Sequence, residues 1–334
     1  MPSDFRLEQL TRWIHRTKPN AKLEVASADA SFRRYFRVSE GQQTWIAMDA
    51  PPDKETLIPF IDVGERLVAV SVQAPKLHEK DLEQGFLLMD DLGSIPYLAQ
   101  LNPKTVDSLY GDALSALVKI QSASITDLPT YDETLLSNEL ELMPQWFLRE
   151  HLGIALSESE LSDLKEVFRF LTQTALDQPQ VFVHRDYHSR NLMITSQRNP
   201  GVIDYQDAVL GPITYDLASI LRDCYIAWSE ERVGGWVDDF RLMAIDAELL
   251  SSDIDQETFR RWFDLMGLQR HIKVLGIFAR LCHRDGKQAY LNDLPQTLSY
   301  VLAVARRYTE TSSLTILFER YDIPERIGTI EIPA

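Results

Sequence analysis

The sequence VFVHRDYHSRN, from Val181 to Asn191, contains the pattern H-R-D-x-x-x-x-N directly after an apolar segment. Thirteen residues later, Asp204 ends a second apolar segment, Val202-Ile203. We expect Asp186 on a loop between two strands, where its carboxylate can orient a substrate hydroxyl. Asn191 and Asp204 carry the oxygen ligands that Mg²⁺ prefers. The spacing is typical of phosphoryl transfer and predicts a catalytic Asp186 and a metal site at Asn191 and Asp204.

The same loop allows other interpretations of its basic residues. His184 and His188 have the spacing of a zinc-binding pair, but the Glu of H-E-x-x-H is absent and the predicted context is a loop, which disfavours a metal–histidine site. We expect His184 to hold the loop by hydrogen bonds and Arg185 to pair with Asp216. His188 either contacts substrate or packs in the interior, and the sequence leaves both open.

The pattern of apolar residues outside this loop changes near residue 93. Before that point, short strand-like segments surround one main helix, whereas the rest is mostly helical with a small β-like insert at 181–205. The pattern predicts an α+β chain of two lobes, residues 1–92 and 93–334. We expect strands at 22–26, 32–38, 44–48, 75–79 and 85–89, and helices at 5–14, 55–70, 103–122, 135–151, 157–176 and from 214 to about 320.

Composition excludes several classes of protein. The 334 residues include 34 Lys and Arg against 50 Asp and Glu, a net charge of −16, which disfavours binding to nucleic acid or to an anionic membrane. Two distant cysteines exclude a disulfide scaffold and fit a reducing compartment. From the charged first residues and the absence of a long uncharged run, we expect neither a signal peptide nor a membrane-spanning helix. We therefore expect a cytoplasmic protein, and we expect it to be monomeric.

The loop and the segment Gly211–Ala218, GPITYDLA, resemble the aminoglycoside phosphotransferase and choline kinase superfamily, whose fold is protein-kinase-like. The resemblance implies a small β-rich N-terminal lobe that binds nucleotide and a larger, mostly helical C-terminal lobe that carries catalysis and sugar binding. It implies ATP and Mg²⁺ as cofactors. It also implies that Asp216 braces the catalytic loop from the start of a helix.

Blocks spread over nearly the whole chain are similar to a narrower group, the anomeric N-acetylmuramate/N-acetylglucosamine kinases of cell-wall recycling. They are ADASFRRYFR at 28–37, AMDAPP at 47–52, GFLLMDDLG at 85–93, GLQRH at 267–271 and GIFARLCHRDGK at 276–287. The resemblance implies ATP-dependent phosphorylation of the C1 hydroxyl of either amino sugar, giving an α-1-phosphate.

The sequence departs from the wider superfamily at Met48, where kinases carry the strand-3 Lys that pairs with the ATP phosphates and a helix Glu. We expect Ser31, Arg33 or Arg34 to help anchor the phosphates instead. The partner glutamate is either Glu55 or Glu65. By analogy, the backbone around Asp90 and Leu92 would contact the adenine.

The sugar must bring its C1 hydroxyl to Asp186, and the lactyl carboxylate of N-acetylmuramate calls for a cation. Candidate carboxylate-binding residues are Arg280, His283 and Arg284, with Arg270 next. Tyr187 is a candidate for stacking on the sugar, Asp223 for accepting from its hydroxyls, and His188 for a further contact.

Two other functions remain possible from the sequence. Another small-molecule kinase of the superfamily would act on an aminoglycoside, choline or a homoserine-like alcohol. A pseudokinase would explain Met48, but Asp186, Asn191 and Asp204 are all intact, and a non-catalytic protein has no chemical need for the three together.

Overall fold

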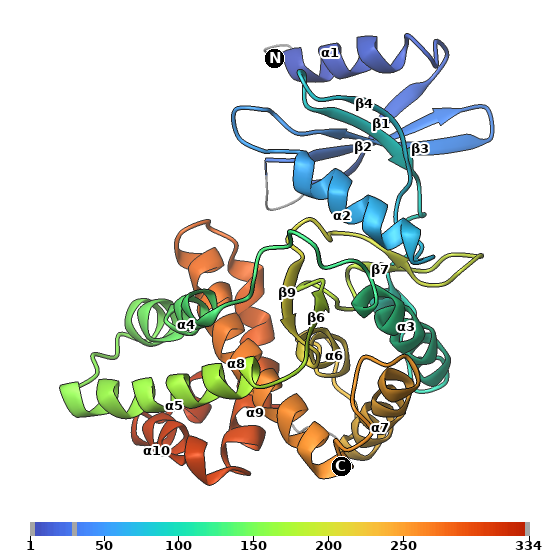
Figure 1. Ribbon diagram of the computed structural model, residues 1–334. Helices are drawn as coiled ribbons and strands as arrows, with labels where there is room; N and C mark the ends of the chain where they lie inside the picture. Colours follow the sequence, from blue (N-terminus) through green and yellow to red (C-terminus); the bar gives the residue numbers. More distant parts are fainter. Residues whose placement is uncertain (1–3, 29–31, 331–334) are drawn as a thin grey trace. The chain divides into compact units, whose positions relative to one another are not determined.

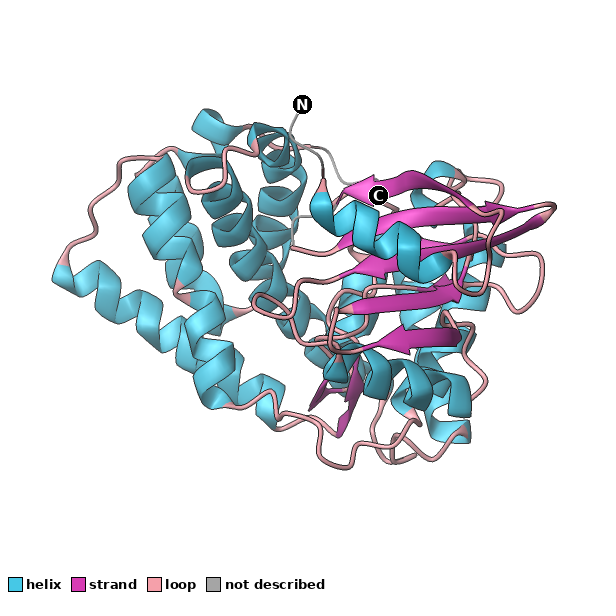
Figure 2. Cartoon of the chain, turned by 90° about the horizontal axis from the view of Figure 1, so that it is seen from above, coloured by secondary structure: helices cyan, strands magenta, loops and turns pink. Residues whose placement is uncertain are grey.

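Five antiparallel strands form one sheet, in the order β1-β2-β3-β5-β4, in the computed structural model, which describes residues 4–28 and 32–330. The strands appear as neighbouring arrows in Figure 2. All five lie close to the predicted ranges, because alternating apolar residues such as Phe36 and Val38 are buried while Arg37 between them is partly exposed. Their bounds are Lys22–Ala28 (β1), Arg34–Glu40 (β2), Gln43–Asp49 (β3), Leu77–Asp81 (β4) and Phe86–Asp90 (β5).

Helices lie on both sides of this sheet (Figure 1). The helix α1 (Phe5–Ile14) begins at Asp4, whose side chain accepts a hydrogen bond from the backbone N–H of Leu7. Its apolar face packs on one side of the sheet, where Trp13 meets Phe86. The helix α2 (Ile58–Ala69) lies on the other side. This confirms the predicted β-rich part with one main helix after the first three strands.

The first compact unit also takes in a distant part of the chain. It consists of the residues up to Tyr97 together with Asn191–Asp207. The second segment forms the short pair β7 (Leu192–Met193) and β8 (Gly201–Val202), and the backbone of Val202 donates to the carbonyl of Gln73. The predicted division into lobes 1–92 and 93–334 stays a prediction.

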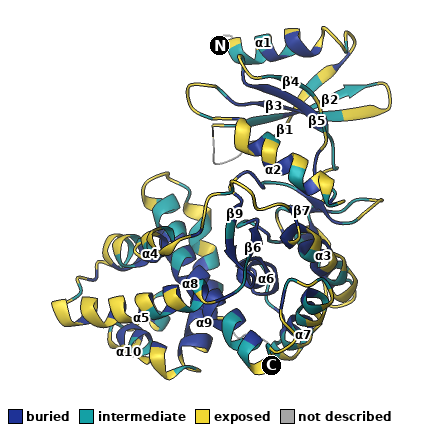
Figure 3. Ribbon diagram, in the orientation of Figure 1, coloured by how far each residue is buried: buried dark blue, intermediate teal, exposed yellow. Residues whose placement is uncertain are grey.

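The second unit, Leu98–Arg190 with the chain from Ala208, is mostly helical. Its central element is α8 (Gln256–His283), which is buried along its middle (Figure 3). Adding a Cβ at Gly276 would bring it within 2.4 Å of the backbone of Leu142, so glycine is needed there for close packing. The other helices of this unit are α3 (Val106–Gln121), α4 (Glu133–Leu140), α5 (Glu158–Leu176), α6 (Tyr215–Leu221), α7 (Glu230–Asp246), α9 (Leu294–Ala305), α10 (Ser312–Arg320) and α11 (Ile323–Ile327), with one π-helical segment, η2 (Met143–His151), and short 3-10 turns.

The sequence-based expectation of a single helix at 135–151 is wrong. The structure has α4 up to Leu140 and then the π-helical segment η2. Pro144 provides the physical reason, because it has no N–H to donate to the carbonyl of Leu140 and its ring clashes with that carbonyl.

One strand of the second unit was not anticipated. The strand β9 (Val209–Pro212) pairs antiparallel with β6 (Gln180–Val183). Its four residues are too few to show an alternation of apolar and polar side chains, and the strand is stabilised by its pairing with β6. The catalytic loop follows β6, and α6 follows β9. Because the two strands pair, they bring the loop and the start of α6 together.

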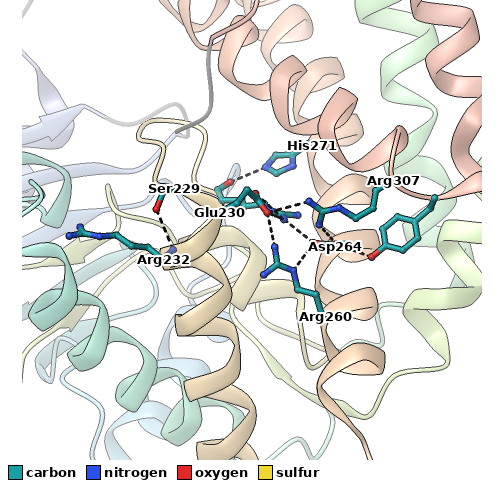
Figure 4. A network of polar contacts seen from close by, with 9 residues as sticks. Ser229, Glu230, Arg232, Arg260, Asp264, His271 and Arg307 are labelled. Atoms are coloured by element: carbon teal, nitrogen blue, oxygen red, sulfur yellow. Dashed lines mark hydrogen bonds and ion pairs between the residues drawn. The ribbon is translucent and has the colours of Figure 1, made fainter. Parts of the chain in front are cut away.

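A network of ion pairs holds the helices of this unit together (Figure 4). Asp264 on α8 has no exposed surface and pairs with Arg222 at 2.8 Å and with Arg307 at 2.5 Å. Glu230 at the start of α7 pairs with Arg260 at 2.7 Å. Burial raises the pKa of Asp264, but the nearby arginines outweigh it and hold the pKa below its usual range. The network thus keeps a buried carboxylate ionised.

No helix within residues 4–28 and 32–330 is both long enough and apolar enough to span a membrane.

Candidate active site

The loop after β6 is held by one buried carboxylate. Asp216, in the first turn of α6, has no exposed surface, and its two oxygens accept from the backbone N–H groups of His184 at 2.6 Å and Arg185 at 2.9 Å. This confirms the prediction that Asp216 braces the loop from the start of a helix. Arg185 does contact Asp216, as expected, but it does so through its backbone N–H and not through its side chain.

The Arg185 side chain turns instead to a second ionic group. Its guanidinium donates to Glu139 of α4 at 2.6 Å, and Lys273 of α8 approaches the same oxygen at 2.8 Å. Burial raises the pKa of Glu139, but Lys273 and Arg185 outweigh it, so the pKa is lowered. Arg185 has a φ of +76°, in the left-handed region, and these contacts hold that backbone conformation in place.

Asp186 follows immediately and is partly exposed. Its backbone N–H donates to Nδ1 of His184 at 3.3 Å, which confirms that His184 holds the loop by a hydrogen bond. Burial raises the pKa of Asp186, but the electrostatic effect of His188, Lys273, His184 and Arg185 outweighs it, and the pKa is lowered. Asp186 is therefore an ionised carboxylate that can accept a hydrogen bond from a substrate hydroxyl.

The two predicted metal ligands lie side by side in the first unit. The side-chain amide of Asn191 donates to Asp204 Oδ2 at 3.3 Å, and the backbone N–H of Ile203 donates to the Asn191 carbonyl at 3.1 Å. Gln206 donates to the other oxygen, Oδ1 of Asp204, at 2.9 Å. A carboxylate and an amide suit Mg²⁺, which takes few protein ligands and completes its shell with water and phosphate oxygens. Across residues 4–28 and 32–330 we find no group of three His, Cys, Asp or Glu suited to a metal.

The residues predicted to anchor phosphate differ in their surroundings. Ser31 lies outside the described residues. Arg33 pairs with Glu55 at 3.1 Å, and its side chain is 10 % exposed. Arg34 is held by Asp49 and Asp4. Arg34 is therefore committed to carboxylates that join α1 to the sheet, whereas Arg33 is joined to the segment before α2.

The position of the expected strand-3 Lys is occupied by Met48, which has no exposed surface. Of the two glutamates that the sequence left open, Glu55 pairs with Arg33, whereas Glu65 is exposed on α2. Of the two, Glu55 is therefore the glutamate that is paired with a candidate phosphate-anchoring arginine, and the anchoring itself stays a prediction.

The predicted adenine-contacting segment follows β5. The carboxylate of Asp90 accepts from the backbone N–H of Lys76 at 3.2 Å and contacts His78 at 2.7 Å. Leu92 lies next to Gly201, where an added Cβ would come within 3.0 Å of the Leu92 side chain. Asp91 is bound by Arg37 at 2.7 Å. The segment is thus tied to its own unit by side chains, and contact with adenine stays a prediction.

Two of the predicted sugar contacts have structural roles. Tyr187 has no exposed surface, and its hydroxyl donates to the carbonyl of Ala113 at 2.8 Å, so the structure contradicts the expectation that its ring stacks on a sugar. Asp223 is 1 % exposed and accepts from the backbone N–H of Ser189 at 2.9 Å and from its hydroxyl at 2.5 Å. Asp223 therefore braces the second half of the loop. His188 is partly exposed, and its ring packs nearly perpendicular to the Tyr225 ring, with centroids 5.5 Å apart.

The predicted carboxylate-binding residues lie at the end of α8. His283 is exposed and contacts His151 of η2, with 3.0 Å between Nε2 and Nδ1. Arg284 is exposed and makes two hydrogen bonds to Asp285, at 2.7 and 2.9 Å. Burial, and then the nearby Arg284, lower the pKa of Arg280. The contacts of His283 and Arg284 do not lead to the catalytic loop, and a sugar contact for the three stays a prediction.

Three side chains near the loop were missed by the sequence analysis. Glu139 and Lys273 form the ionic group beneath Arg185. Little in the sequence singled them out, because an isolated charged residue in a helix is usually exposed to solvent. Arg190 stands inside the H-R-D-x-x-x-x-N pattern, at a position that the pattern leaves free, and it lies over the Tyr225 ring. Its place in the loop was the available signal.

Comparisons with known proteins show the fold and the family of the chain. The model of the phosphotransferase enzyme family matches residues 22–263. A choline kinase from Cryptosporidium parvum superposes with a TM-score of 0.63 at 12% identity, covering 93% of this chain and 98% of that one. An aminoglycoside phosphotransferase in complex with gentamicin gives a TM-score of 0.61 at 15% identity, covering 89% and 97%. The fold is thus the expected protein-kinase-like one, and the chain belongs to the phosphotransferase enzyme family.

Relatives of higher sequence identity identify a smaller group within this family. Proteins named N-acetylmuramate/N-acetylglucosamine kinase are 43% identical in Pseudomonas putida, covering 93% of this chain and 95% of the relative, and 44% identical in Pseudomonas aeruginosa, covering 92% and 94%. A protein of the same name in Neisseria meningitidis is 40% identical, covering 92% and 94%. Within the phosphotransferases, the chain is a member of this group of kinases.

The buried bracing carboxylate gives a prediction about pH. Burial raises the pKa of Asp216 to about 7, despite the two backbone donors that stabilise its ionised form. In an unfolded chain the pKa is about 4, so between these values the folded state binds more protons. The contribution of Asp216 to the free energy of unfolding is therefore present below about pH 4 and is lost as the pH rises to about 7, by up to about 4 kcal/mol.

Denaturant unfolding of the wild type and of Asp216→Asn from pH 4 to 8 tests this. The free energy of unfolding of the wild type minus that of the variant should fall as the pH rises. A difference that stays constant or grows would contradict the prediction. Should the variant fail to fold, carbon NMR titration of the wild-type Asp216 carboxyl would give the same answer.

Proposed function

We propose that this protein transfers the γ-phosphoryl group of ATP to the C1 hydroxyl of N-acetylmuramate and of N-acetylglucosamine, giving the α-1-phosphate for peptidoglycan recycling. The observation that carries the proposal is the 40–44% identity to three proteins with this kinase name over more than nine-tenths of the chain. The family model supports phosphoryl transfer independently.

Asp186 is the catalytic residue in this proposal. Its carboxylate accepts a hydrogen bond from the sugar C1 hydroxyl, aligns that oxygen with the γ-phosphorus and receives the proton as the new P–O bond forms. Its lowered pKa supports this role, because only the ionised form accepts. Asp216 and Asp223 hold the two halves of the loop and so keep Asp186 oriented before substrate arrives.

Asn191 and Asp204 would hold Mg²⁺, which when bound would neutralise charge on the phosphate oxygens. The hydrogen bonds from Ile203 to Asn191 and from Gln206 to Asp204 hold these two residues in place.

Arg33 takes over phosphate anchoring from the absent strand-3 Lys. The pair with Glu55 keeps the guanidinium in place, much as glutamate positions the lysine in other kinases. Arg34 is bound by Asp4 and Asp49 and is assigned a structural role.

The protein is proposed to act as a monomer on small molecules in the cytoplasm, where ATP is available. The competing functions, another small-molecule kinase or a pseudokinase, predict different results in the first of the following experiments.

A substrate panel tests the function. Coupled ADP release with Mg²⁺-ATP should show turnover on N-acetylmuramate and N-acetylglucosamine, with an acid-labile product phosphate, and not on glucose, choline, homoserine or kanamycin. Asp186→Asn should lower turnover by about 10³-fold while ATP binding is retained, because only the proton acceptor is lost. Turnover on choline or kanamycin instead would contradict the sugar assignment, and turnover on nothing would favour a pseudokinase.

The metal site can be tested by Mg²⁺ titration. Asp204→Asn should raise the Mg²⁺ concentration needed for half-maximal activity by about tenfold or more, because a charged ligand is lost. The neighbouring exposed residue Asp207 provides a control, and Asp207→Asn should leave the Mg²⁺ dependence unchanged. An unaltered Mg²⁺ requirement in Asp204→Asn would contradict the assignment.

The KM for ATP distinguishes the proposed roles of Arg33, which directly precedes β2, and Arg34, the first residue of β2. Arg33→Ala should raise the KM for ATP about 10- to 100-fold, the cost of one charged hydrogen bond, with little effect on the KM for sugar. Arg34→Ala should lower the melting temperature with little effect on the KM for ATP. The assignment is overturned if both variants keep the wild-type KM for ATP.

A further inference from the structure

A guanidinium and an aromatic ring form an exposed polar shelf beside the catalytic loop. The guanidinium carbon of Arg190 lies 3.4 Å from the centre of the Tyr225 ring, and the Arg190 side chain is 44% exposed. Asp293, just before α9, reaches Arg190 only at 3.9 Å. We call Arg190, Tyr225 and Asp293 the arginine shelf. All three belong to the second unit.

The shelf adjoins the reacting carboxylate through His188. The His188 ring lies against Tyr225, with centroids 5.5 Å apart, and its backbone N–H donates to the Asp186 carbonyl at 3.1 Å. Asp186 and His188 also interact electrostatically. Arg190 is the fourth residue after Asp186 in the same braced loop. A molecule that places a hydroxyl at Asp186 therefore has the shelf within the reach of its other substituents.

The shelf has the chemistry of a carboxylate-binding site. Stacking on an aromatic ring fixes the plane of a guanidinium and leaves its N–H groups pointing outward along the edge. At 3.9 Å, the Asp293 carboxylate is beyond hydrogen-bond distance, so it attracts the charge without making a close two-point contact. An incoming carboxylate can make that contact with two parallel hydrogen bonds.

Two of the other cations considered for this role, Arg284 and Arg270, are less suited. Arg284 already has a two-point contact with Asp285. Arg270 is 6% exposed and lies behind Cys224, which it contacts at 3.7 Å. Arg190 combines exposure, a fixed orientation and a position in the catalytic loop.

The two sugars of the proposed reaction differ in one group, the lactyl carboxylate that N-acetylmuramate carries and N-acetylglucosamine lacks. We propose that Arg190, held on Tyr225, binds this carboxylate and sets the preference of the enzyme between the two sugars. This inference rests on the proposed function. With N-acetylglucosamine bound, Asp293 supplies the negative charge that Arg190 requires, which explains how a single site accepts both sugars.

Kinetics on both sugars test the inference, since they separate recognition of the carboxylate from positioning of the loop. In Arg190→Gln, kcat/KM for N-acetylmuramate should fall about 10- to 100-fold, whereas that for N-acetylglucosamine should stay within about threefold of wild type. Arg190→Lys should show a smaller loss of kcat/KM that is equally selective for N-acetylmuramate, because lysine keeps the positive charge but cannot make the two parallel hydrogen bonds of a guanidinium. Arg306→Gln removes an exposed arginine of the same unit and should change neither value.

A substrate variant completes the design. The primary amide of the lactyl group removes the negative charge and preserves the shape of the sugar. The wild type should favour N-acetylmuramate over this amide by about 10- to 100-fold, and Arg190→Gln should have lost most of that preference. The difference between the two preferences measures the contact of the arginine with the carboxylate.

The other possible results would overturn either the inference about Arg190 or the proposed function. An equal loss on both sugars in Arg190→Gln would show a role in loop positioning and overturn the inference while the proposed function stands. A loss selective for N-acetylmuramate in Arg284→Gln, with Arg190→Gln unaffected, would move the carboxylate site to the end of α8. A wild type that phosphorylates neither sugar would overturn the proposed function, and the inference with it.

Discussion

The catalytic loop depends on one interaction, the acceptance of two consecutive backbone N–H groups by the buried carboxylate of Asp216. The loop must turn sharply after β6, and Arg185 has a left-handed backbone conformation that few residues adopt without support. Asp216 can provide the support because the β6–β9 ribbon brings the start of α6 beside the loop. The direction of the Asp186 carboxylate follows from this arrangement.

The loop is held at its other end by the same device. There, Asp223 accepts from the backbone and the hydroxyl of Ser189. At the first end, Glu139 adds to the Asp216 contact by binding the Arg185 side chain. Buried carboxylates cost free energy, which donors of the loop offset in part, and at Glu139, Lys273 of α8 contributes as well. Phosphoryl transfer requires positioning more than covalent chemistry, so a loop fixed before substrate binds is suited to that reaction.

Two arginines of the described residues are oriented by a neighbouring group. A methionine buried in β3 removes the usual lysine, and the pair of Arg33 with Glu55 supplies a cation in the same unit. In the second unit, Arg190 lies on Tyr225 next to the catalytic loop. The neighbour is a carboxylate in one case and a ring in the other, and each limits the orientations that a flexible side chain can adopt.

The sequence alone determined the strands of the sheet and the group of kinases, because alternation of apolar residues and motif spacing are local properties of the chain. Only the tertiary structure decided that Tyr187 belongs to the core, that Asp223 braces the loop and that Arg190 lies on Tyr225. These roles depend on partners far away in the sequence. Within a loop, neighbouring side chains point in different directions, and the direction of each is set by whatever packs against the loop.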